Sequence, residues 1–199
     1  ADVVLHWHPG DANDASPSTT LANRSAKFRF RGVAAHAAVS PERGRSALDG
    51  VEAMNHMVNL LREHVPQETR IHYVITQGGL APNVVPEFAE VYYYVRHPSA
   101  PMLNEIWERV EQTARGAAMG TGTTVDREII HGNHRILTNL TLARLVHANL
   151  ERLGGVHYTA EEEEFARRIQ ETFGRAIRPL GSEQQIQPFR ERQGMGSSD

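Results

Sequence analysis

Histidines at two positions near the start of the chain could hold a metal ion. His6 and His8 lie two residues apart after a short apolar run, so a strand would place both imidazoles on one side. One buried and one exposed histidine would give the same spacing. Because two ligands alone make a weak metal site, the pattern leaves both interpretations open.

A third histidine, His36, lies in a loop of small residues, AAHAA over residues 34–38. No bulky neighbour screens its imidazole, which suits the donation of a hydrogen bond to a developing oxyanion. A lone loop histidine is also compatible with a structural or solvent-facing role. The same ambiguity applies to His131 and His134, near the end of a later strand.

Asn83 and Arg96 could together bind a carboxylate. Asn83 follows a Gly-Gly pair, and Arg96 ends a strand-like run on its outward face. The planar guanidinium of arginine and the amide donors of asparagine both match carboxylate oxygens. A turn asparagine and a surface arginine would explain the same residues without any ligand.

Alternation and helical spacing predict the elements that position these residues. Apolar residues alternate with polar ones over residues 25–31, 71–75, 88–96 and 123–130, which predicts four strands. Apolar residues spaced by three and four predict one helix after Ser46, with Asp49 in capping-box position, and a second opened by Ser99 and Pro101.

The order of these elements predicts an α+β fold. Strand, helix, strand, strand, helix and strand over residues 18–131 favour a ferredoxin-like, four-stranded antiparallel sheet with both helices on one face. A strand over residues 2–5 and helices over residues 138–153 and 159–177 flank this unit. We expect residues 1–17 and 132–199 to be parts of an α/β domain whose remainder lies outside this sequence.

Composition excludes several function classes. The 199 residues include no cysteine, which removes disulfide scaffolds, thiolate zinc sites and cysteine nucleophiles, so any metal must use His, Asp or Glu. A formal charge of -3 provides no basic field for nucleic acid. Apolar runs of about five residues cannot cross a membrane. With Ala1 first and no signal-peptide pattern, we expect a cytoplasmic protein and a chain cut from a longer one.

Several segments in one order carry a family resemblance. They are residues 2–8 followed by Pro9, the GVAAHAA loop at 32–38, SALD at 46–49, residues 78–86 with Arg96 thirteen residues after Asn83, and GSSD at 196–199. Together they resemble the aminoacylase and carboxypeptidase type of metal-dependent amidohydrolase, most closely its aminobenzoyl-glutamate utilisation branch.

The resemblance implies a fold, a reaction and a role for each residue. It implies a catalytic domain with two zinc or manganese ions, interrupted by a four-stranded lid, residues 18–131, that forms a homodimer. His8 falls on a metal ligand, and His36 on a lid histidine that stabilises the oxyanion in the partner's active site. Asn83 and Arg96 fall on residues that hold the substrate's carbonyl or carboxylate. The implied reaction is hydrolysis of the amide bond of an N-acyl or N-aroyl amino acid.

The departures from the family pattern leave a second interpretation open. The family's H-x-D ligands, its glutamate pair and its final histidine ligand are not in this sequence, so we expect the isolated chain to be inactive. The alternative is a stand-alone ferredoxin-like module for dimerisation or carboxylate binding, without catalysis. A metal-sensing domain using His6 and His8 is a third interpretation. We also expect an edge strand of the lid to pair with the same strand of a second copy of the chain.

Overall fold

The computed structural model describes residues 2–10, 12–174, 181 and 184–191. The chain divides into two compact units. Among the described residues, one comprises residues 20–136, and the other comprises those up to residue 19 together with those from 137 to 191. Within the described residues, no helix is both long and apolar enough to span a membrane.

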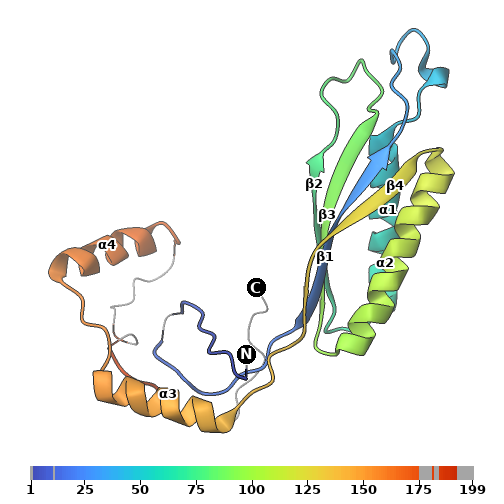
Figure 1. The fold of residues 1–199 in the computed structure, drawn as a ribbon. Helices are drawn as coiled ribbons and strands as arrows, with labels where there is room; N and C mark the ends of the chain where they lie inside the picture. The colour runs from blue at the N-terminus through green and yellow to red at the C-terminus, as the bar shows by residue number, and fades with distance from the viewer. Residues whose placement is uncertain (1, 11, 175–180, 182–183, 192–199) are drawn as a thin grey trace. The chain divides into compact units, whose positions relative to one another are not determined.

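The unit of residues 20–136 is a four-stranded antiparallel sheet with two helices packed on one face (Figure 1). The strands run in the order β2-β3-β1-β4. This arrangement confirms the predicted ferredoxin-like α+β fold. Its elements are β1 (Ala22–Arg31), α1 (Ala47–Leu61), β2 (Arg70–Gln77), β3 (Phe88–His97), α2 (Ala100–Thr121) and β4 (Thr124–Asn133), with short 3-10 turns η1 (Pro41–Arg43) and η2 (Arg62–His64).

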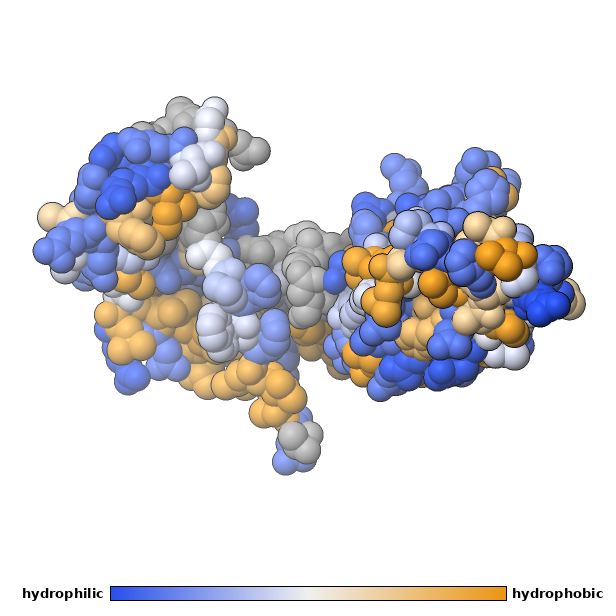
Figure 2. Space-filling model, turned by 90° about the horizontal axis from the view of Figure 1, so that it is seen from above, coloured by the Kyte–Doolittle hydropathy of each residue, from blue (hydrophilic) through white to orange (hydrophobic). Residues whose placement is uncertain are grey.

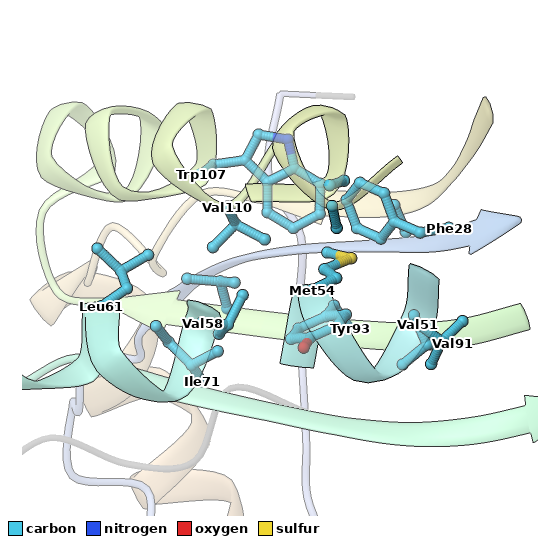
Figure 3. Packing of buried hydrophobic residues seen from close by; sticks show 14 of the residues in the cluster. Phe28, Val51, Met54, Val58, Leu61, Ile71, Val91, Tyr93, Trp107 and Val110 are labelled. Carbon is cyan, nitrogen blue, oxygen red and sulfur yellow. The ribbon is translucent and has the colours of Figure 1, made fainter. Parts of the chain in front are cut away.

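Alternate strand residues and one stripe of each helix form the core (Figure 3). Phe28 of β1 and Tyr93 of β3 meet edge to face with ring centroids 5.9 Å apart, and Trp107 of α2 lies against Phe28 at 6.0 Å. Burial of each large apolar side chain contributes about 1.5–3 kcal/mol. The predicted apolar stripes are therefore the faces that hold the helices on the sheet. Their buried members include Val51, Met54, Val58, Leu103, Ile106, Val110, Ala114 and Ala117.

Local signals in the sequence set the ends of the helices. The Ser46 hydroxyl accepts a hydrogen bond of 3.1 Å from the Asp49 N–H, which caps α1. Gly122 ends α2 in the left-handed conformation, at φ 66°. Gly32 follows β1, where a Cβ would lie 1.8 Å from the Arg45 carbonyl oxygen, so only glycine fits this close approach.

The second unit contains two amphipathic helices, α3 (Leu140–Leu153) and α4 (Ala160–Glu171). Thr159 and Glu162 form the predicted capping box at the start of α4. Neither helix buries a residue in the described part of the chain. Apolar side chains such as Leu145 and Phe165 stay exposed, and orange patches mark the surfaces of both units in Figure 2.

Two predictions for this second unit are wrong in detail. The strand predicted over residues 2–5 is absent, because a strand needs a hydrogen-bonded neighbour and these residues pair with no other described segment. The helix predicted to reach residue 177 ends at Glu171, and the last residues of that prediction lie outside the described residues. The GSSD segment at 196–199 also lies outside them.

Candidate functional site

The structure brings His36 and Asn83 together. Their loops, residues 32–46 and 78–87, project from the same end of the sheet (Figure 1). His36 forms an antiparallel bridge with Val84, and the Ala37 N–H donates a 3.0 Å hydrogen bond to the Asn83 carbonyl oxygen. The Val85 N–H donates to the Ala35 carbonyl oxygen at 2.9 Å. Backbone pairing between two loops therefore fixes these residues beside each other.

Hydrogen bonding around His36 defines which ring nitrogen faces outward. Its side chain is exposed, and its Nδ1 lies 3.3 Å from the Ala38 N–H. Because this bond needs a lone pair on Nδ1, the neutral ring carries its proton on Nε2. The Nε2–H is left as a hydrogen-bond donor at the exposed tip of the unit, which is the geometry that an oxyanion would require.

A tight connection places Asn83 next to Val84, the residue that pairs with His36. Gly79 adopts φ +101°, and a Cβ on it would lie 2.8 Å from the ring of Pro86. Asn83 itself is exposed, next to the bridging residue Val84. Its side-chain amide is therefore available at the same tip as the His36 imidazole.

Arg96 lies at the opposite end of the sheet. β3 begins with Phe88 opposite Arg31, and Arg96 pairs with Asn23 and Arg70 eight residues later. Eight residues of strand span roughly 26 Å. One carboxylate therefore cannot contact Asn83 and Arg96 of the same chain. The Arg96 guanidinium carbon lies 5.0 Å from the centre of the Tyr94 ring.

His8 has one ring nitrogen engaged and one available. Its Nδ1 lies 2.8 Å from the Pro9 carbonyl oxygen. A carbonyl only accepts, so Nδ1 carries the proton and Nε2 is the nitrogen that could bind a metal, an arrangement common among histidine ligands. Throughout the part of the chain that the structure describes, no group of three His, Cys, Asp or Glu side chains could hold a metal ion. The described residues therefore form no complete metal site by themselves.

Sequence reasoning missed a hydrogen-bonded cluster on the open face of the sheet. The His131 Nε2 lies 2.9 Å from the Tyr94 hydroxyl, and the His131 Nδ1 lies 3.2 Å from the Ser25 hydroxyl. The alternation of β3 identifies Tyr94 as outward-facing, but nothing in the sequence links His131 to it. The neighbours of His131 follow only from the pairing of β1 with β4, where Ser25 stands opposite His131.

The same face carries a buried carboxylate, Glu90, which is 6% exposed. Lys27 and Arg29 lie 3.2 Å and 2.8 Å from its oxygens, and the Thr76 hydroxyl donates to it at 2.7 Å. Burial raises the pKa of Glu90, but the hydrogen bonds from Arg29, Thr76 and Lys27 outweigh burial and hold the pKa below its usual value. Glu90 is thus a fixed charge that ties β1, β2 and β3 together.

Comparison with known proteins relates the chain to a family. A family model described as "Peptidase dimerisation domain" matches residues 22–122. One subunit of the p-aminobenzoyl-glutamate hydrolase of Escherichia coli (strain K12) is 42% identical over 172 residues, which cover 86% of this chain and 36% of that protein. The Xaa-Arg dipeptidase of Mus musculus is 34% identical over 154 residues, covering 77% of this chain and 36% of that protein.

Solved structures share the fold. An amidase of the hydantoinase/carbamoylase family from Burkholderia vietnamiensis superposes with a TM-score of 0.60 at 21% identity, over 73% of this chain and 35% of that one. The chain thus spans about a third of the length of the curated relatives it matches, at 36% for the first two.

Proposed function

Because the chain belongs to the peptidase dimerisation domain family, we propose that it is the lid-bearing portion of an amide hydrolase. The proposed substrates are N-acyl or N-aroyl amino acids such as p-aminobenzoyl-glutamate, the compound in the name of its relative of 42% identity. The observation that carries the proposal is the exposed His36 Nε2–H beside Asn83 at the tip of the sheet.

Each of these residues has a role in the proposed reaction. His36 donates its Nε2–H to the oxyanion that forms when the amide carbonyl is attacked. The Asn83 amide contacts the same carbonyl from the neighbouring loop. Arg96 binds the substrate carboxylate through its planar guanidinium. Since Arg96 lies about a strand length from the tip, it would serve a different active site from the His36 and Asn83 of its own chain.

Metal dependence is proposed for the complete enzyme. His8 is the proposed ligand in this chain, and two Mn or Zn ions are expected in the whole active site, where they would polarise the substrate carbonyl. The described residues do not form such a site by themselves.

A homodimer through the β2 edge would bring His36 and Asn83 of one chain and Arg96 of the other into one site. β2 and β4 lie at the two edges of the sheet. Both edges expose apolar side chains, Val74 and Ile75 on β2 and Ile129 and Ile130 on β4, and both have a register shift. They differ in charge, because β4 carries Asp126, Arg127 and Glu128 in a row, all in ion pairs, whereas Arg70 is the one Lys, Arg, Asp or Glu of β2. Charge therefore favours β2 as the edge that a second copy would extend.

The test of catalysis is a His36→Ala substitution in the complete enzyme, assayed with p-aminobenzoyl-glutamate. We expect kcat to fall by about 10²–10³ with KM nearly unchanged, since the hydrogen bond forms in the transition state. His56→Ala, at an exposed position of α1, is the matched control and should leave kcat unchanged. An unchanged kcat in His36→Ala would remove this residue from the mechanism. Binding of the substrate without any turnover by the complete protein would favour a carboxylate-binding module.

The test of the dimer is the mass of the chain in solution. Val74→Lys would place like charges across the two-fold pairing and should produce a monomer. Ile129→Lys on β4, at an exposed position of 52%, should leave the dimer intact. A monomeric wild-type chain at micromolar concentration would contradict the proposal.

A further inference from the structure

A row of polar residues crosses the open face of the sheet next to Arg96. Ser25 stands opposite Tyr94 on β3 and opposite His131 on β4, so the three lie in one line over three strands. Arg96 lies two residues beyond Tyr94 and therefore shares its face. The core residues Tyr93 and Val95 alternate with them and face the helices. This row therefore lies on the face of the sheet that the helices leave uncovered.

Contacts hold the Tyr94 side chain in this row from several sides. Its hydroxyl lies 2.9 Å from the His131 Nε2, and the two rings meet at 66° with centroids 4.9 Å apart. The other nitrogen of His131 lies 3.2 Å from the hydroxyl of Ser25, which is fully buried. Tyr92 packs edge to face against Tyr94 with centroids 5.5 Å apart. The Tyr94 ring therefore cannot turn without breaking these contacts.

The fixed ring lies against the Arg96 guanidinium. The guanidinium carbon is 5.0 Å from the centre of the Tyr94 ring, within the range of a cation–π contact. An arginine side chain has many rotamers, and one that is held in place loses less entropy when it binds a carboxylate. Burial raises the pKa of Tyr94, so its hydroxyl stays protonated and keeps its hydrogen bond to His131 at neutral pH.

We propose that Tyr94 and His131 are positioning residues for Arg96. The Arg96 guanidinium lies against the Tyr94 ring. His131 holds this ring in place through its hydrogen bond with the Tyr94 hydroxyl. The inference rests on the proposed function, in which Arg96 binds the substrate carboxylate. It adds that affinity for this carboxylate depends on two residues that do not contact the substrate.

The first test observes the position of Arg96 directly, in the 199-residue chain. In an NMR spectrum of the side-chain Nε–H groups, assigned by Arg96→Lys, the Arg96 signal should be shifted upfield by the Tyr94 ring. Tyr94→Leu should return it to the position of an ordinary exposed arginine. Tyr73→Phe, a control on the helix-covered face of the sheet, should leave it in place. An unshifted wild-type signal, or one unmoved by Tyr94→Leu, overturns the inference whatever the enzyme does.

The second test uses the complete enzyme with p-aminobenzoyl-glutamate and its neutral α-amide. Tyr94→Leu should raise KM for the carboxylate substrate about tenfold with little change in kcat, and the α-amide should show no such increase. In an Arg96→Ala background the effect of Tyr94→Leu should disappear. If Tyr94→Leu does not fold, Tyr94→Phe and His131→Gln should each raise the same KM about threefold, and unchanged values overturn the inference.

The NMR and kinetic experiments together distinguish a failure of this inference from a failure of the proposed function. If Arg96→Ala raises KM but the Tyr94 and His131 variants do not, only the positioning role is wrong. If Arg96→Ala leaves KM unchanged while the NMR signal responds to Tyr94→Leu, the contact between Arg96 and the Tyr94 ring exists and the proposed role of Arg96 in substrate binding is wrong.

Discussion

A buried hydrogen bond between Tyr93 and Asn55 joins the two elements that follow the His36 and Asn83 loops. Tyr93 is fully buried on β3, and its hydroxyl donates to the Asn55 side-chain oxygen on α1 at 2.5 Å. Burial raises the pKa of Tyr93 far above its usual value, so this hydroxyl remains a donor at any ordinary pH. β3 follows the Asn83 loop and α1 follows the His36 loop, so the bond helps to fix both loops.

Removal of either partner should cost more than one ordinary hydrogen bond. In Tyr93→Phe the Asn55 oxygen stays buried without its donor, because Asn55 is only 6% exposed. We expect a loss of about 2 kcal/mol in the free energy of unfolding. Asn55→Leu should cost a similar amount by leaving the Tyr93 hydroxyl buried. The double variant should lose at least about 1 kcal/mol less than the sum, because it leaves no polar group unpaired.

Urea unfolding followed by fluorescence measures these losses. The chain has two tryptophans, of which Trp107 is 2% exposed in the core and Trp7 is 80% exposed in the other unit. A Trp7→Phe background leaves Trp107 as the reporter of the unit that contains the bond. A loss of about 2 kcal/mol should lower the urea midpoint by about 1 M. Losses that simply add in the double variant, or an unchanged midpoint in Tyr93→Phe, would refute this reasoning.

Three further predictions concern stability. Gly122→Ala should lower the free energy of unfolding by about 1 kcal/mol, because Gly122 has φ +66°. Gly120→Ala, where a Cβ meets nothing within 4 Å, is the control. Equal melting temperatures for the two variants would contradict this prediction. Because the folded-state pKa of Glu90 is depressed, its contribution to stability should be lost as pH falls below the ordinary value of 4.5. Glu90→Gln should therefore flatten the plot of melting temperature against pH in this range. An equally steep plot would exclude Glu90 as the source of the pH dependence. Residues 20–136 expressed alone should unfold cooperatively in urea, since the core lies within them, and a non-cooperative transition would show otherwise.

Sequence patterns predicted the strands and helices of residues 20–136 because each of them buries one face. Burial of one face produces a regular spacing of apolar residues along the sequence. The alternation of Ala89, Val91, Tyr93 and Val95 identified β3, and all four are buried. Glycine and serine signals marked the helix ends at Ser46 and Gly122. The strand over residues 2–5 failed because pattern cannot supply a pairing partner.

The candidate site was harder to predict, since sequence spacing does not report distance. Asn83 and Arg96 are thirteen residues apart in the sequence, and their hydrogen-bond donors suggested one carboxylate site. Most of that interval is strand β3, and an extended strand carries its ends far apart. His131 had no distinguishing neighbours in the sequence, and its role depends on Ser25 and Tyr94, which the antiparallel pairing brings to it.

The separation of His36 and Arg96 by a strand length has a consequence for mixtures of two impaired variants. If one active site takes Arg96 from one protomer and His36 from its partner, a mixed dimer of His36→Ala and Arg96→Ala chains contains one intact site and one doubly damaged site. Random exchange makes half of the dimers mixed, so activity at substrate concentrations well below KM should return to about a quarter of the wild-type value. Neither variant alone should reach this level, and a mixture of His36→Ala with His36→Ala/Arg96→Ala chains is the matched control, which stays inactive. Exchange of subunits is verified by mass. If activity does not recover in the first mixture, either both residues act in the same active site from one chain, or one of them takes no part in the reaction.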